Sequence, residues 1–186
     1  TMGIKPHIMT IAKGLSSGYA PIGGSIVCDE VAEVINACEF NHGYTYSGHP
    51  VCAAVALENL RIMQEENIVD HVRDVAAPAL KEAMDKLGEH PLVGGVNVSG
   101  LMASLPLTPD KESRAQFADG GVAGYTCREH CFANNLVMRH VGDRMIISPP
   151  LVITPEEIKI FAARATKALD ATYADLKDKD MLKAAS

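Results

Sequence analysis

The stretch IAKGLSSGYAPIGG, residues 11–24, decides the fold, because it joins the end of an apolar run to a loop rich in glycine, serine and proline. The run from His7 to Ala12 predicts a strand, and a second apolar run from Ser25 to Cys28 follows the loop. Lys13 stands at the junction, ahead of Gly14, whose missing side chain lets a ligand approach the backbone. A lysine partly shielded from water at a strand end is suited to attack a carbonyl group. On this local pattern alone, a lysine whose amine simply reaches water is the alternative.

A second distinctive loop, HGYTYSGHP at residues 42–50, places Thr45 32 positions after Lys13. Pro50 predicts the start of a helix, because its missing N–H is not needed in the first turn. Hydroxyl groups in a glycine-containing loop ahead of a helix suit the binding of a phosphate dianion. The alternative is that Thr45 and Ser47 are turn and helix-cap hydroxyls. The helical spacing of five apolar residues predicts one buried face: Ala53, Ala56, Leu57, Leu60 and Met63.

The rest of the chain alternates helical and strand patterns, which is typical of the α/β class. We expect two domains, residues 1–66 and 67–186, bridged by a single long helix, with a kink or break at Pro78. Thr154, Pro155 and Glu157 form the pattern of a capping box at the start of the last helix. The other predicted elements are a helix at 29–38, a helical run at 72–87, paired strands at 92–98 and 101–107, a helix at 122–134, and two short strands at 136–139 and 145–147.

Composition excludes several classes of function. The net charge of −6 disfavours nucleic acid as a partner. No apolar stretch is long enough for a membrane helix, and no secretory signal is recognisable. Five cysteines are an odd number and suit free thiols in the cytoplasm.

We also predict no metal site. His42 and His49 lie seven residues apart and lack a carboxylate or thiolate partner in the sequence around them. Cys127, His130 and Cys131 share one predicted helix, but no second pair of ligands accompanies them, so packing is the favoured role of the two cysteines. Asp29 and Glu30 open a predicted helix, where carboxylates favour the positive helix end.

The lysine loop, the HGYTYSGHP loop and the segment LVMRHVGDRMIISPPLVIT at residues 136–154 together resemble the class III aminotransferases of the omega-amino acid and amine:pyruvate type. The resemblance covers nearly the whole chain. It implies a fold-type I transferase that depends on pyridoxal 5′-phosphate. Residues 1–66 would be the end of its large domain, and residues 67–186 its small C-terminal α/β domain.

The resemblance also implies roles for three residues. Lys13 matches the lysine that forms the Schiff base with the cofactor and then moves a proton between substrate and cofactor carbons. Thr45 matches a threonine that reaches across a homodimer interface to the cofactor phosphate. Arg139 matches a mobile arginine that pairs with a substrate carboxylate and swings away for an uncharged amine. From the residues alone, Arg144 competes for this role, and a surface arginine on a hairpin is the other interpretation.

The activity implied by the resemblance is transfer of an amino group from an amine or omega-amino acid to a keto acid such as pyruvate, with the donor left open. A decarboxylase or an aminomutase on the same fold, or an inactive piece that serves only as a dimerisation domain, are the alternatives. The family's other cofactor contacts lie upstream of its lysine, so we expect this chain to be the C-terminal half of a longer protein and inactive alone. The chain departs from the family pattern where Pro6 is followed by His7 rather than aspartate, and where Val96 to Gly100 replaces a Val-Arg-Gly-x-Gly segment.

Overall fold

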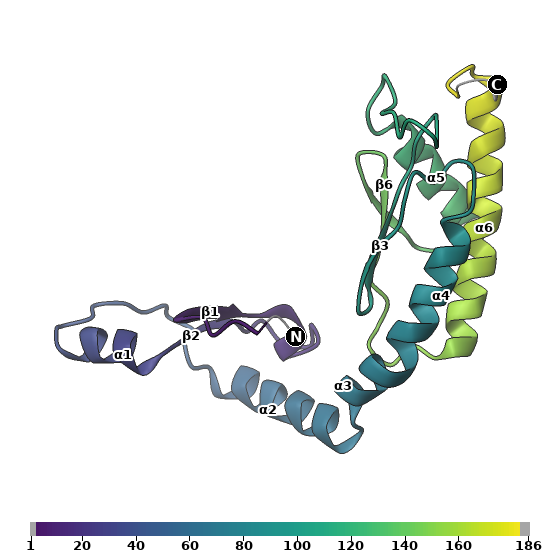
Figure 1. Ribbon diagram of the computed structural model, residues 1–186. Helices are drawn as coiled ribbons and strands as arrows, with labels where there is room; N and C mark the ends of the chain where they lie inside the picture. The colour runs from purple at the N-terminus through teal and green to yellow at the C-terminus, as the bar shows by residue number, and fades with distance from the viewer. Residues whose placement is uncertain (1–2, 183–186) are drawn as a thin grey trace. The chain divides into compact units, whose positions relative to one another are not determined.

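A computed structural model describes residues 3–182 and divides the chain into two compact units, residues 1–67 and 68–186. Within the described residues, no helix combines the length and the apolar character that crossing a membrane requires. Each unit mixes helices and antiparallel strands (Figure 1). The two units are described separately below.

The first unit is built around a two-stranded antiparallel sheet. Strands β1 (Ile8–Ile11) and β2 (Gly24–Val27) pair so that Ile8 faces Val27 and Ile11 faces Gly24. The loop between them begins with a short 3-10 helix, η1 (Lys13–Leu15), and both strands lie where the apolar runs predict them. Helices α1 (Asp29–Asn36) and α2 (Pro50–Glu65) follow, and Pro50 occupies the first turn of α2 as expected.

The predicted buried face of α2 is only partly present. Ala56 is buried, but Leu57 and Leu60 are 69% and 42% exposed. The prediction that these two leucines are buried is therefore wrong for the structure described here. Their helical period is real, but the described residues cover these two side chains only in part, so the first unit presents apolar side chains to its surroundings.

The second unit is a four-stranded antiparallel sheet covered on one face by helices. The strand order is β3-β4-β6-β5, and helices α4 and α6 run side by side along the sheet (Figure 1). The elements are α3 (Ile68–His71), η2 (Val72–Ala76), α4 (Ala77–Leu87), β3 (Asn97–Ser99), β4 (Met102–Pro106), α5 (Val122–Ala133), β5 (Arg139–Val141), β6 (Arg144–Ile147) and α6 (Pro155–Asp178).

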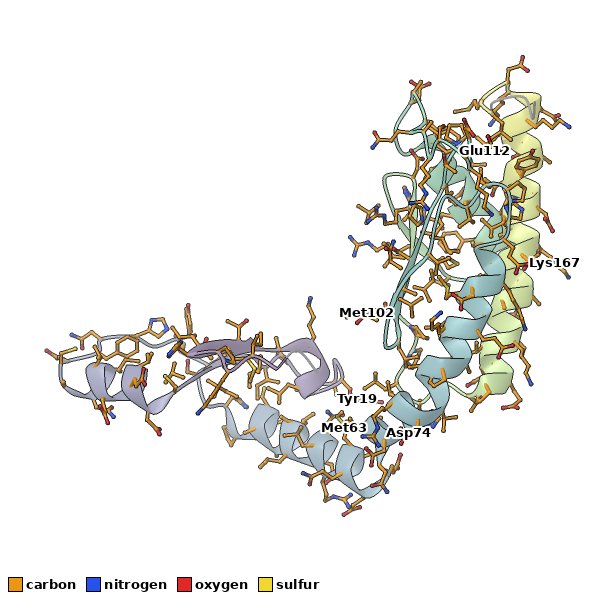
Figure 2. All side chains as sticks on the ribbon, viewed as in Figure 1. Tyr19, Met63, Asp74, Met102, Glu112 and Lys167 are labelled. Atoms are coloured by element: carbon orange, nitrogen blue, oxygen red, sulfur yellow. The ribbon has the colours of Figure 1, made fainter. Side chains whose placement is uncertain are left out.

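The core of this unit lies between the sheet and the helices. Leu105 and Met145 project from the sheet and are at most 1% exposed, whereas Met102, on the opposite face, is 67% exposed (Figure 2). Burial of apolar side chains on one face stabilises the sheet by roughly 1.5–3 kcal/mol for each large residue. The helices contribute five further large side chains that are at most 2% exposed: Leu80, Met84, Ile158, Leu169 and Leu176.

The predicted capping box is confirmed in detail, and just before Pro78 a π-helical turn stands where a kink or break was expected. At the start of α6, the Glu157 N–H donates to Thr154 Oγ1 at 3.2 Å, and the Thr154 N–H donates to Glu157 Oε2 at 2.8 Å. The Thr154 N–H and, next to it, the Thr154 hydroxyl both donate to the Glu157 carboxylate, and they hold the pKa of Glu157 below its usual range. Near Pro78, which lacks an N–H, the helix widens into the π-helical turn η2, where the Ala77 N–H donates to the Val72 carbonyl.

The expected single helix linking the two domains is interrupted. Helix α2 ends at Glu65, and Asn67 has a left-handed backbone with φ of 50°, which an α-helix does not accommodate. The helix resumes at Ile68 as α3. Asn67 therefore separates two helices that the apolar period alone would join.

Two strand predictions need correction. The strand predicted at 92–98 is reduced to one bridge, between Val93 and Leu107, and to β3. The strand predicted at 136–139 begins only at Arg139, which opens β5. The Leu136 N–H donates to the Cys131 carbonyl at 2.9 Å, so the residues before Arg139 close the end of α5 instead of pairing with β6. The pairing of β3 with β4, and of β5 with β6, is confirmed.

Candidate functional site

The turn that carries Lys13 has a left-handed backbone at two non-glycine residues, Lys13 and Ser17. Lys13 follows the last residues of β1 and has a φ of 51°, in the left-handed region. A non-glycine residue pays about 1–2 kcal/mol for that conformation, and such strain gathers at functional sites. Inside the turn, the Leu15 N–H donates to the Ala12 carbonyl at 3.1 Å and the Ser16 N–H to the Lys13 carbonyl at 3.3 Å.

A residue far along the chain supports this turn. The side-chain amide of Asn59, on α2, donates to the carbonyls of Gly14 at 3.0 Å and Leu15 at 3.2 Å. Its carbonyl oxygen accepts a hydrogen bond of 2.7 Å from the Ser17 hydroxyl. Sequence reasoning missed Asn59, although its place three residues after Ala56 on the inner face of α2 was a usable signal.

Lys13 and Thr45 both leave their reactive groups free. Within the described residues, neither the Lys13 amine nor the Thr45 hydroxyl forms a hydrogen bond or an ion pair, and both residues are exposed. The partial shielding from water expected for Lys13 is therefore not present in this structure. The neighbouring Ser47 does act as a turn hydroxyl, because its Oγ accepts from the Tyr44 N–H at 3.2 Å. The first unit therefore offers one free amine on a strained turn and one free hydroxyl ahead of α2.

Arg139 lies in the second unit, on the sheet face that the helices leave open. It pairs with Ile146 across β5 and β6 and is exposed. It lines a cavity of about 450 Å³ whose other walls are mostly apolar, with Val137, Pro149 and Phe161 among them. A guanidinium group beside apolar walls can pair with a carboxylate or turn away to leave an apolar space.

Arg144 lies at the turn end of the β5–β6 hairpin, where it pairs with Val141, whereas Arg139 pairs with Ile146 at the other end. Arg144 opens β6 and lines a different cavity, of about 780 Å³, together with Gly94, Arg114 and Gln116. The structure therefore assigns the two competing arginines to two cavities. Only the cavity of Arg139 combines one guanidinium with mostly apolar walls.

Cys127 and Cys131 are buried at 1% exposure each, which agrees with a packing role. The Cys131 thiol contacts the Met138 sulfur at 3.8 Å. A hydrogen bond with the Cys127 thiol, as the larger cause, and burial, as the smaller one, raise the pKa of Cys131 far above its usual range. Cys131 therefore stays a protonated, inert thiol.

One group of metal-type donors was not foreseen. Within residues 3–182, donor atoms of His7, Cys28 and Glu30 lie within 4.8 Å of one another. The side chains of His7 and Glu30 are 72% and 84% exposed, and they contact each other at 3.6 Å. Among the described residues, no other ion pair or side-chain hydrogen bond orients either of them. Metal ligands are normally oriented by further hydrogen bonds, so we assign no metal to this group.

Comparison with known proteins identifies relatives over nearly the whole chain. A sequence model of the class-III aminotransferases matches residues 1–169. The putrescine–pyruvate aminotransferase of Pseudomonas aeruginosa is 54% identical over 173 residues, which cover 92% of this chain and 38% of that protein. The mitochondrial gamma-aminobutyrate transaminase 1 of Oryza sativa subsp. indica is 38% identical over 95% of this chain and 36% of its own length.

Solved structures agree with these matches. The omega transaminase from Pseudomonas jessenii in complex with PMP superposes with a TM-score of 0.89 at 34% identity, covering 94% of this chain and 40% of that one. A transaminase obtained by ancestral reconstruction gives a TM-score of 0.88 at 38% identity, again over 94% of this chain and 40% of that one. The chain thus spans about two fifths of the length of the relatives that it matches.

Proposed function

The chain belongs to the class-III aminotransferase family, and from this membership we propose that the full protein transfers an amino group from an amine to a keto acid. Pyruvate is the proposed acceptor and a diamine such as putrescine the proposed donor, because the relative with 54% identity is a putrescine–pyruvate aminotransferase. The observation that carries the proposal is Lys13, whose free amine stands on a strained turn in the loop that matches the family.

The residues of this chain fit pyridoxal 5′-phosphate, the cofactor of this family. Lys13 offers a free primary amine to an aldehyde, and the free hydroxyl of Thr45 is a donor suited to a phosphate oxygen. When bound, the cofactor supplies the electron sink that makes a substrate C–H acidic. The amine of Lys13 would take that proton from the substrate carbon and deliver it to the cofactor carbon. Arg139 would hold the carboxylate of the keto acid.

We further propose that the full protein is a cytoplasmic homodimer formed through the large domain, of which residues 1–66 are the end. Thr45, exposed in the first unit, would serve the cofactor site of the second subunit. The exposed apolar side chains of this unit, Leu57 and Leu60 among them, support burial against further protein. The five free cysteines support a reducing compartment.

Product analysis of the full-length protein tests the reaction. With cofactor, putrescine and pyruvate, we expect alanine to form in amounts equal to the amine consumed. 2-Oxoglutarate in place of pyruvate should give a markedly lower rate. Carbon dioxide release, or an amino group moved within one molecule without alanine formation, would instead identify a decarboxylase or an aminomutase.

Arg139→Ala tests the carboxylate contact. Hydrogen bonds to charged groups contribute about 1.5–3 kcal/mol, so we expect the KM for pyruvate to rise roughly 10–100-fold. The rate of the half-reaction with putrescine, which has no carboxylate, should stay within about twofold. Steady-state kinetics measure the KM for pyruvate, and single-turnover absorbance measures the rate of the half-reaction with putrescine. Arg144→Ala is the matched control, and an equal rise in KM in both variants would contradict the role of Arg139.

A further inference from the structure

We propose that Asn59 is the positioning residue for Lys13: from helix α2 it fixes the turn on which the amine stands. The inference rests on the proposed function and extends it to a residue outside the two motif loops. Asn59 lies 45 positions from Gly14 and 44 from Leu15, so its bonds to their carbonyls exist only in the folded unit.

The Asn59 side chain uses its hydrogen-bonding capacity on the lysine turn. Both N–H groups of its amide have a carbonyl of the turn within reach, at Gly14 and at Leu15, and the amide nitrogen also lies 3.7 Å from the Met63 sulfur. The oxygen accepts from the Ser17 hydroxyl. Gly14, Leu15 and Ser17 directly follow Lys13, so one side chain clamps the turn at three points.

The strain at Lys13 explains why such a clamp is needed. With a φ of 51°, Lys13 occupies a conformation that it would leave if the turn were free. The amine stands at the end of a long side chain, and a rotation of about 10° at Cα displaces it by about 1 Å. A misplacement of 1 Å at a reacting group can cost about 10²-fold in rate. Holding the carbonyls of Gly14 and Leu15 therefore sets where the amine acts.

The expected effect of Asn59→Leu, which keeps the size but removes the polar atoms, is a defect in proton transfer. In the full-length enzyme we expect kcat to fall roughly 10–100-fold and the KM for the donor to change less than about threefold. The primary deuterium isotope effect on kcat, measured with a donor deuterated at the reacting carbon, should increase because proton transfer becomes rate-limiting.

A second measurement does not need the cofactor. In the cofactor-free full-length protein, hydrogen exchange of the amides of Leu15, Ser16 and Ser17, which are bonded within the turn, should be at least tenfold faster in Asn59→Leu than in the wild type. Ser17→Ala, which removes one of the three contacts, should give an intermediate acceleration. Gln64→Leu is the matched control, because Gln64 is an exposed amide on the same helix with no side-chain bond to the turn.

The outcomes separate this inference from the proposed function. If the wild type forms no alanine, the proposed function fails whatever Asn59 does. If the wild type is active, and Asn59→Leu has the same kcat and the same amide hydrogen exchange in the turn as Gln64→Leu, the positioning role is overturned. A lower melting temperature with an unchanged isotope effect and unchanged exchange in the turn would also overturn it, because Asn59 would then be merely structural.

Discussion

Lys13→Ala in the full-length protein should abolish transamination. Proton transfer by a positioned base alone contributes about 10²–10⁴-fold to a rate, and the variant also loses the amine that attaches the cofactor. We therefore expect a loss of at least that size in kcat, measured as alanine formed from pyruvate. The prediction rests on the proposed role of Lys13, whose amine is free and whose turn is strained.

Covalent labelling separates this loss from misfolding. After incubation with pyridoxal phosphate and reduction with borohydride, peptide mapping of the wild type should place one cofactor on Lys13. The Lys13→Ala variant should carry none at that peptide. Lys5→Ala, which changes an exposed lysine ahead of β1, should keep both label and activity. Substantial transamination in Lys13→Ala would refute the assignment of this lysine.

Signals that are local in the chain predicted the structure well. The capping box at Thr154 needs only four consecutive residues, and it forms as expected. Pro78 predicts a break because its ring removes one hydrogen bond, and the π-helical turn η2 is the form that the break takes. Lys13 and Thr45 were singled out by the resemblance of their two loops to the class III aminotransferases, because the local pattern alone left other interpretations open, and their roles stay predictions.

Signals that depend on the whole fold were harder to read. An apolar run beginning at Leu136 predicts a strand. The Leu136 N–H instead donates to the Cys131 carbonyl near the end of α5, and β5 starts only at Arg139. The apolar period of α2 indicates which residues share a face, but it does not indicate whether other residues cover that face. Leu57 therefore fits the period and is nevertheless exposed. The position of Asn59 three residues after Ala56 indicates the inner face of α2, but the local sequence does not say which carbonyls, more than 40 residues away, its amide meets.

Gly124→Ala should have the largest effect on stability. Gly124 lies near the start of α5, and a Cβ atom there would stand 2.1 Å from the Gly142 carbonyl oxygen and 3.2 Å from the Cα of Asp143. Both are backbone atoms of the turn between β5 and β6, which cannot turn aside as a side chain can. Alanine would gain at most about 1 kcal/mol in helix propensity, whereas overpacking against fixed neighbours costs about 1–3 kcal/mol or more.

The clash would also break the bonds that tie the helix to the sheet. The Asp143 carboxylate accepts from the Gly121 N–H at 2.9 Å and from the Gly124 N–H at 3.0 Å, and so caps the start of α5. Moving α5 away to admit a methyl group would lengthen both bonds, at about 1 kcal/mol for each. The losses exceed the gain, and we expect a net destabilisation of about 3 kcal/mol.

Thermal unfolding of the full-length protein measures this effect. The midpoint of Gly124→Ala should fall by roughly 6–12 °C, at about 2–4 °C for each kcal/mol. Gly120→Ala is the matched control, because a Cβ atom at Gly120 meets no atom within 4 Å, and its midpoint should stay within about 1 °C of the wild type. A midpoint of Gly124→Ala at or above that of the control would show that α5 moves off the β5–β6 turn without loss. The close approach of helix and turn would then contribute nothing to the stability of the second unit.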